Sequence, residues 1–194
     1  MQNIRNAGLL ALLLVFSAGA GTAFAQVEEV RLGVLDHDIN LTGNGAGGKE
    51  GGVNIAVELV FASPNFLSWA WSPRPFIHGS LNTDGLTNFA GAGLSWQFDL
   101  TDRIFFESNS GLVIHDGITQ LSDDPGDPER ILLDATRVIL GSRVLFRLAL
   151  SLGVRVNDDW DASVVFEHLS HGQILASGRN EGLDNIGFRL SRKF

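Results

Sequence analysis

The sequence predicts an all-β fold, an eight-stranded antiparallel transmembrane β-barrel, and three observations lead to this prediction. Apolar and polar residues alternate along eight segments, so each segment has one oily face and one polar face. The segments are long enough to cross a membrane as tilted strands, and their number is even. Long and short connections alternate between them. A soluble sandwich would also alternate, but it would bury its oily faces against each other.

The N-terminal residues are typical of a secretory signal peptide. Arg5 precedes an apolar run from Ala7 to Phe16, and Ala23-Phe24-Ala25 has the pattern of a cleavage site. The alternative, a membrane anchor, needs about 20 apolar residues in a row, and this run is shorter. We therefore expect residues 1–25 to be a signal peptide and residues 26–194 to form one outer-membrane β-barrel.

The alternation is clearest in the second, fourth and sixth segments. In the second, Val53 to Phe61 place every other residue on an apolar face, with Asn54 and Glu58 opposite. In the sixth, a long apolar face opposes Arg147 and Arg155. All five prolines fall between segments or at the start of one, where no ladder hydrogen bond is lost. The predicted strands span residues 29–38, 52–62, 75–83, 88–100, 103–116, 139–157, 159–170 and 183–194.

The connections and the aromatic residues suggest how the barrel lies in a membrane. With a periplasmic N-terminus, the long connections 39–51, 117–138 and 171–182 all fall on the extracellular side. Phe194 ends the last segment, as in the C-terminal signature of bacterial outer-membrane barrels, although an accidental aromatic end would look the same. The four tryptophans fit an interfacial girdle or ordinary packing. We therefore expect the Gram-negative outer membrane as the location, with its lipids as surroundings.

Composition excludes some partners and cofactors. The chain has no cysteine and a net charge of −8, which argues against disulfides and against nucleic acid as a partner. The connection 117–138 carries Asp123, Asp124, Asp127 and Glu129, which could bind a divalent cation. Their spacing matches no calcium motif, so a solvated acidic loop is favoured and no metal is predicted.

Three polar side chains interrupt the oily faces of the last two segments. His168 and Ser170 continue the apolar face of Val164 and Phe166, and Asp184 continues that of the next segment. A serine hydroxyl needs a nearby base to act as a nucleophile, and an acid on the other imidazole nitrogen orients that base. We therefore predict Ser170, His168 and Asp184 as catalytic residues. Asn180, in the connection before Asp184, could donate its amide to an oxyanion.

These residues resemble those of a known family. The stretch EHLSHGQILASGRNEGLDNIGFRL, residues 167–190, is similar to the C-terminal strand pair of the lipid A 3-O-deacylase (PagL-like) family, which has a H-x-S motif and an acid after N-x-G. The opening EVRLGVLDHDIN, residues 29–40, is also similar to that family. Two departures stand out. The family's acid is often Glu, whereas here it is Asp184, and Asn-Ala often follows H-x-S, whereas here it is His171-Gly172.

The resemblance implies a cofactor-free serine esterase in the outer membrane. Its substrate would be lipid A of lipopolysaccharide, from which it would remove an ester-linked 3-hydroxyacyl chain. Ser170 would be the nucleophile, His168 the base and Asp184 the orienting acid, with Asn180 near the oxyanion. The sequence leaves open a phospholipid ester target, a homodimer, a non-enzymatic structural or adhesive barrel, and a soluble periplasmic binding barrel.

Overall fold

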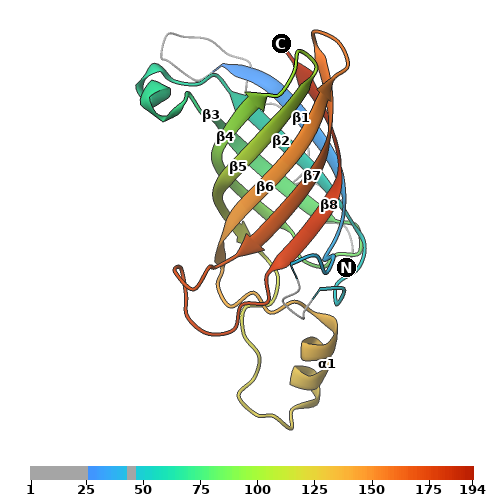
Figure 1. Cartoon of the computed structure of the whole chain (residues 1–194). Coiled ribbons are helices and arrows are strands. Elements are labelled where there is room, and N and C mark those ends of the chain that lie inside the picture. The colour runs from blue at the N-terminus through green and yellow to red at the C-terminus, as the bar shows by residue number, and fades with distance from the viewer. Residues whose placement is uncertain (1–25, 43–46) are drawn as a thin grey trace, which may run out of the picture.

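The computed structural model describes residues 26–42 and 47–194, and the expected signal peptide lies outside these residues. The described residues form a closed barrel in which eight antiparallel strands pair in chain order and β1 pairs with β8 (Figure 1). The predicted fold class is thus confirmed. The strands are β1 (Val27–Asp36), β2 (Val53–Phe61), β3 (Arg74–Asn82), β4 (Phe89–Asp99), β5 (Ile104–His115), β6 (Val144–Arg155), β7 (Trp160–Ser170) and β8 (Leu183–Lys193).

In the described residues, two short helices accompany the strands. The 3-10 helix η2 (Asn65–Ala70) joins β2 to β3, and α1 (Pro128–Thr136) lies between β5 and β6. Asp127 caps α1, because its side chain accepts the backbone N–H of Glu129. The described residues contain no helix long and apolar enough to cross a membrane.

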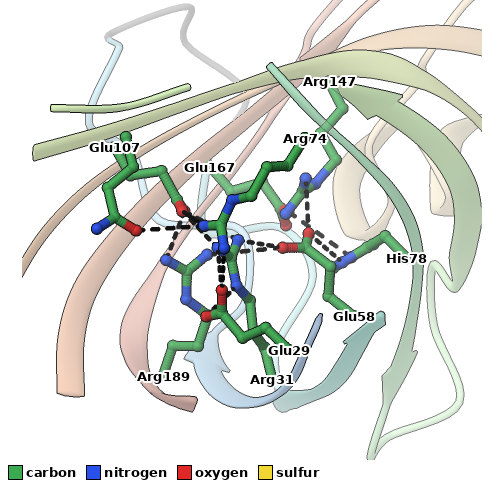
Figure 2. A network of polar contacts seen from close by, with 10 residues as sticks. Glu29, Arg31, Glu58, Arg74, His78, Glu107, Arg147, Glu167 and Arg189 are labelled. Carbon is green, nitrogen blue, oxygen red and sulfur yellow. Dashed lines mark hydrogen bonds and ion pairs between the residues drawn. The ribbon is translucent and has the colours of Figure 1, made fainter. Parts of the chain in front are cut away.

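The oily faces of the strands point outward and the charged faces point inward. Leu32 and Val34 are each 56% exposed on the outside of β1, whereas Arg31, the residue before Leu32, is 1% exposed. Inside, Arg31 donates to Glu29 at 2.7 Å and to Glu58 at 2.6 Å, and also contacts Glu107 (Figure 2). An apolar exterior around a charged interior is the pattern of a transmembrane barrel, not of a soluble sandwich.

The two ends of the barrel differ. Figure 1 shows α1 and the connection 171–182 at one end, and the C-terminus with η2 at the other. We call the connections 37–52, 83–88, 116–143 and 171–182 the extracellular cap, because outer-membrane barrels have long extracellular loops and short periplasmic turns.

Aromatic residues mark the periplasmic end. Trp69 and Trp71 are exposed in and just after η2, and the Trp96 Nε1–H donates to the carbonyl of Ala70 at 2.9 Å. Trp160 begins β7, with the Arg192 guanidinium 5.2 Å from its ring centre. All four tryptophans therefore lie at the end with the short turns, where an amphipathic ring suits a membrane interface.

Under the cap, apolar side chains close the barrel interior. Leu169 and Leu183, at the cap ends of β7 and β8, are fully buried in this layer. It consists of Phe89, Val113, Val138, Leu140, Leu145, Leu169 and Leu183. Because Leu169 and Leu183 point inward, the residues next to them on each strand point outward, and these include the predicted catalytic residues.

The structure corrects the start of the sixth predicted strand. The apolar residues Val138 to Leu140 extend its pattern, so the sequence predicts a strand from residue 139, but β6 begins at Val144. Ile139 instead forms an isolated parallel bridge with Ile118 in the cap, and Gly141 turns the chain with a φ of 72°. These residues are buried by the cap, which explains why they are apolar.

Candidate active site

The register of β7 and β8 brings His168 and Asp184 together. They are directly opposite each other in the antiparallel ladder, and the His168 Nδ1 lies 2.6 Å from the Asp184 Oδ1. Closely spaced carboxylate and imidazole groups of this kind fix the orientation of the ring. His168 and Asp184, predicted as base and orienting acid, therefore lie in contact. The carboxylate next to His168 in the sequence, Glu167, points into the barrel instead, where it pairs with Arg147 and Asn185.

Ser170 ends β7 on the same outward face as His168. It is half-buried, lies opposite Phe146 of β6, and stands two residues beyond His168, a rise of about 7 Å along a strand. No hydrogen bond joins Ser170 to His168 in the described part of the chain. Because Nδ1 of His168 is taken by Asp184, the ring presents Nε2 as the nitrogen that could receive a proton from a serine. Such contacts are often long before substrate binds.

Asp184 also accepts hydrogen bonds from the chain that follows β1. The Thr42 backbone N–H donates to the Asp184 Oδ2 at 2.8 Å, and the Ile39 N–H donates to the Asp184 backbone carbonyl at 2.8 Å. Asp184 is consequently only 5% exposed, although it has the outward parity that predicted contact with lipid. Sequence reasoning missed Thr42, because a backbone donor has no characteristic residue type.

Asn180 lies beside the chain that leaves Ser170. Its side-chain oxygen accepts the backbone N–H of His171 at 3.4 Å, which leaves the amide N–H groups as its donors. The placement agrees with a position near the nucleophile. Its predicted oxyanion role stays a prediction.

His171 organises the turn after Ser170. It is fully buried, its Nδ1 accepts the N–H of Gln173, and its Nε2 donates to the carbonyl of Arg179 at 3.1 Å. Gly172 and Gln173 follow with φ values of 62° and 56°. The residue pair that departs from the family pattern therefore has a structural role in the connection that bears Asn180.

Two buried carboxylates tie the extracellular cap together. Glu50 accepts from the His37 ring at 3.1 Å, from the Arg137 Nε at 2.8 Å, and from the backbone N–H groups of Thr87 and Val138. Burial raises the pKa of Glu50, but these donors outweigh burial and hold the pKa at about 2. Glu50 thus joins three of the four cap connections. His37 is buried in this cluster.

Glu181 links the fourth cap connection, residues 171–182, to the other connections. It accepts the Ile139 N–H at 2.7 Å and the Lys49 Nζ at 2.9 Å, and it also contacts Arg179, which reaches Asp134 on α1. Burial raises the pKa of Glu181, but these hydrogen bonds lower it overall. The cap is therefore one hydrogen-bonded unit around the His168 and Asp184 pair.

Two of the four acidic residues considered for a divalent cation have other partners. Asp127 caps α1, and Asp124 accepts the N–H of Gly126 at 2.8 Å. Within residues 26–42 and 47–194, no group of three or more His, Asp or Glu side chains could hold a metal ion.

Comparison with known proteins identifies the relatives of this chain. Residues 101–193 match the family described as "Lipid A 3-O-deacylase (PagL)". The crystal structure of the outer membrane enzyme PagL has a TM-score of 0.57 at 14% sequence identity, covering 86% of this chain and 99% of that chain. The crystal structure of Neisserial surface protein A (NspA) has a TM-score of 0.54 at 11% identity, covering 88% of this chain and 99% of that one. No curated protein matches the chain by sequence.

The matched region contains β5 to β8, with His168 and Ser170 on β7 and Asp184 on β8, and it also contains the connection with Asn180. The solved structures, at such low identity, add the fold of an outer-membrane barrel. Together with the family match, they agree with the expected location in the Gram-negative outer membrane. Residues 101–193 therefore match the lipid A 3-O-deacylase (PagL) family, which confirms the resemblance predicted from the sequence.

Proposed function

We propose that this chain is an outer-membrane serine esterase that removes an ester-linked 3-hydroxyacyl chain from lipid A. The observation that carries the proposal is the 2.6 Å contact between His168 Nδ1 and Asp184 Oδ1, with Ser170 on the same outward face. The match of residues 101–193 to the lipid A 3-O-deacylase family supports the choice of substrate.

The position of the site suits a lipid substrate. It lies on the outer wall of the barrel just below the extracellular cap, at the height where outer-leaflet lipid meets water. Exposed apolar residues such as Leu148 and Ile186 border it on β6 and β8. A lipid acyl chain could lie along this wall while its ester reaches Ser170.

The proposed reaction has two steps. The Ser170 Oγ attacks the ester carbonyl carbon and gives its proton to the His168 Nε2, while Asp184 stabilises the imidazolium through Nδ1–H. The Asn180 amide would donate to the oxyanion. The carbon–oxygen bond to the sugar then breaks, the leaving alkoxide takes the proton from His168, and Ser170 keeps the acyl group. Water, deprotonated by His168, releases the free hydroxy acid and restores the serine.

The test is expression of the chain in a Gram-negative host, followed by mass spectrometry of its lipid A. We expect lipid A that has lost one hydroxyacyl chain, and we expect Ser170→Ala to abolish the change. Ser177→Ala, at an exposed serine in the connection that follows Ser170, is the matched control and should leave the product unchanged.

Each variant must first show heat-modifiable migration, which reports a folded barrel. Unchanged lipid A with folded wild-type protein would contradict the proposal. Activity that persists in Ser170→Ala would contradict the choice of nucleophile. Purified protein given lipid A or a phospholipid separates the two ester targets, since release of fatty acid from phospholipid alone would replace lipid A as the substrate.

A further inference from the structure

We infer that the backbone amide of Thr42 is a positioning group for Asp184, so that the first extracellular connection completes the active site. This inference rests on the proposed function. It concerns a part of the chain that lies outside the residues matched to the family, which begin at residue 101.

The two oxygens of Asp184 have separate partners. Oδ1 lies 2.6 Å from the His168 Nδ1, and Oδ2 accepts the Thr42 N–H at 2.8 Å. A carboxylate bonded at both oxygens cannot rotate about its Cβ–Cγ bond without losing one contact. The Thr42 amide therefore keeps Oδ1 aligned with the imidazole of His168.

The segment before Thr42 is itself fixed to β8. The Ile39 N–H donates to the Asp184 carbonyl at 2.8 Å, and the Asp38 N–H donates to the Asn185 side chain at 3.2 Å. These bonds extend the β1–β8 pairing past the end of β1 at Asp36. The position of Thr42 over Asp184 is thus set by backbone pairing on the strand that carries the acid.

Asp38 braces the same segment from the other side. Its φ is 55°, its Oδ2 accepts the N–H groups of Lys49 and Glu50, each at 2.8 Å, and its carbonyl accepts the Gly48 N–H at 2.6 Å. Since Glu50 is bound to two other cap connections, the contact to Asp184 is part of the hydrogen-bonded cap. The contact also covers the carboxylate, which is why Asp184 is buried on an outward face.

The inference separates the backbone of Thr42 from its side chain. In the described residues the Thr42 hydroxyl makes no hydrogen bond, whereas its N–H donates to Asp184. Thr42→Ala keeps the N–H and should match wild type. Thr42→Pro removes it. Replacing Thr42 by its α-hydroxy acid through cell-free synthesis removes the N–H and keeps the side chain, so it covers the case in which the proline variant does not fold.

The experiment measures lipid A deacylation in detergent micelles together with the NMR signal of the His168 Nδ1 proton. We expect the proline and α-hydroxy acid variants to lose about tenfold in kcat with KM within twofold, as for an aligned group that does not touch substrate. We also expect their His168 Nδ1 proton signal to shift or broaden. Thr42→Ala should change neither measurement.

Three outcomes would overturn the inference. The first is a folded variant that lacks the Thr42 N–H but keeps full kcat and an unchanged proton signal. The second is a loss of kcat in Thr42→Ala as large as in the variants that lack the N–H. The third is a rise in KM without a change in kcat in those variants. If wild type proves inactive on lipid A, the proposed function fails. The proton signal would then still show whether the Thr42 amide aligns His168 and Asp184.

Discussion

At the scale of single residues, the central feature is a carboxylate that faces outward on its strand and yet avoids lipid. Asp184 is 5% exposed, because Thr42 and the chain around it cover the outward side of β8. An ionised carboxylate on the lipid-facing wall would be costly without such partners. The cover therefore permits an acid at a position that the strand pattern alone assigns to lipid.

Replacement of this acid gives the prediction at the residue scale. Asp184→Asn keeps the size of the side chain but removes the charge that stabilises the imidazolium of His168, so we expect kcat on lipid A to fall by about 10² or more. Asp184→Glu, which restores the acid common in the family, should retain more activity than Asp184→Asn. Initial rates in micelles measure both variants, and an asparagine variant within threefold of wild type would show that Asp184 does not act on His168.

Residue identity explains which parts of the site could be predicted. The outward placement of His168, Ser170 and Asp184 could be predicted, because period-two alternation places them among apolar residues on two adjacent strands. Thr42 could not, since its contribution is a backbone N–H. Glu50 could not either, since its partners come from three connections that only the closed barrel brings together.

At the scale of elements, strands with one lipid face were predictable to within a few residues and the cap was not. The strands alternate because lipid and the barrel interior demand different side chains. The cap has no such period, and α1 was therefore predicted as a loop. The sequence Asp127-Pro128-Glu129 nevertheless contains a helix start, with a capping acid followed by proline at the first position.

The cap should become less stable in acid, because protonation of Glu50 weakens its hydrogen bonds. Its pKa of about 2 lies below the ordinary 4.5, so its stabilising contribution is complete above pH 4.5 and is lost as the pH falls toward 2. Burial raises the pKa of Asp38 from its ordinary 3.8 to about 6, although two backbone N–H donors lower it. The contribution of Asp38 to stability is therefore complete below pH 3.8 and is lost as the pH rises through 6. Acid loosening is therefore assigned to Glu50 and to Glu181, whose pKa is also lowered, and the contacts of Glu50 can be tested separately.

Hydrogen exchange at the Thr87 and Val138 amides, corrected for the intrinsic effect of pH, tests this assignment. Both amides donate to Glu50. We expect their protection to fall by up to about a hundredfold between pH 5 and 2.5 in wild type, following the proton linkage. Glu50→Gln should have weak protection at both pH values. Asp123→Asn, at an exposed acid of the cap, should behave as wild type, and protection that does not depend on pH in wild type would contradict the role of Glu50.

At the scale of the whole molecule, closing the sheet turns the polar faces of the strands into a dense network of buried charges. Glu29, Glu58, Glu107 and Glu167 face Arg31, Arg74, Arg147 and Arg189, so the formal charges of these four acids and four bases cancel (Figure 2). His78 lies between Glu58 and Glu167 at 3.4 and 3.8 Å. Only a closed barrel gathers these residues, because they come from seven different strands.

Removal of one charge should show how strongly the network holds the barrel. Arg31→Met leaves three buried carboxylates without their shared partner, so we expect unfolding free energy to fall by about 3–5 kcal/mol. Arg103→Met, at an exposed residue of the turn between β4 and β5, should change it by less than about 0.5 kcal/mol. Urea unfolding in lipid vesicles measures both. Adding Glu107→Gln to Arg31→Met should recover part of the lost unfolding free energy, because one uncompensated charge is removed. If Arg31→Met loses no more unfolding free energy than Arg103→Met, the remaining arginines neutralise the acids without Arg31.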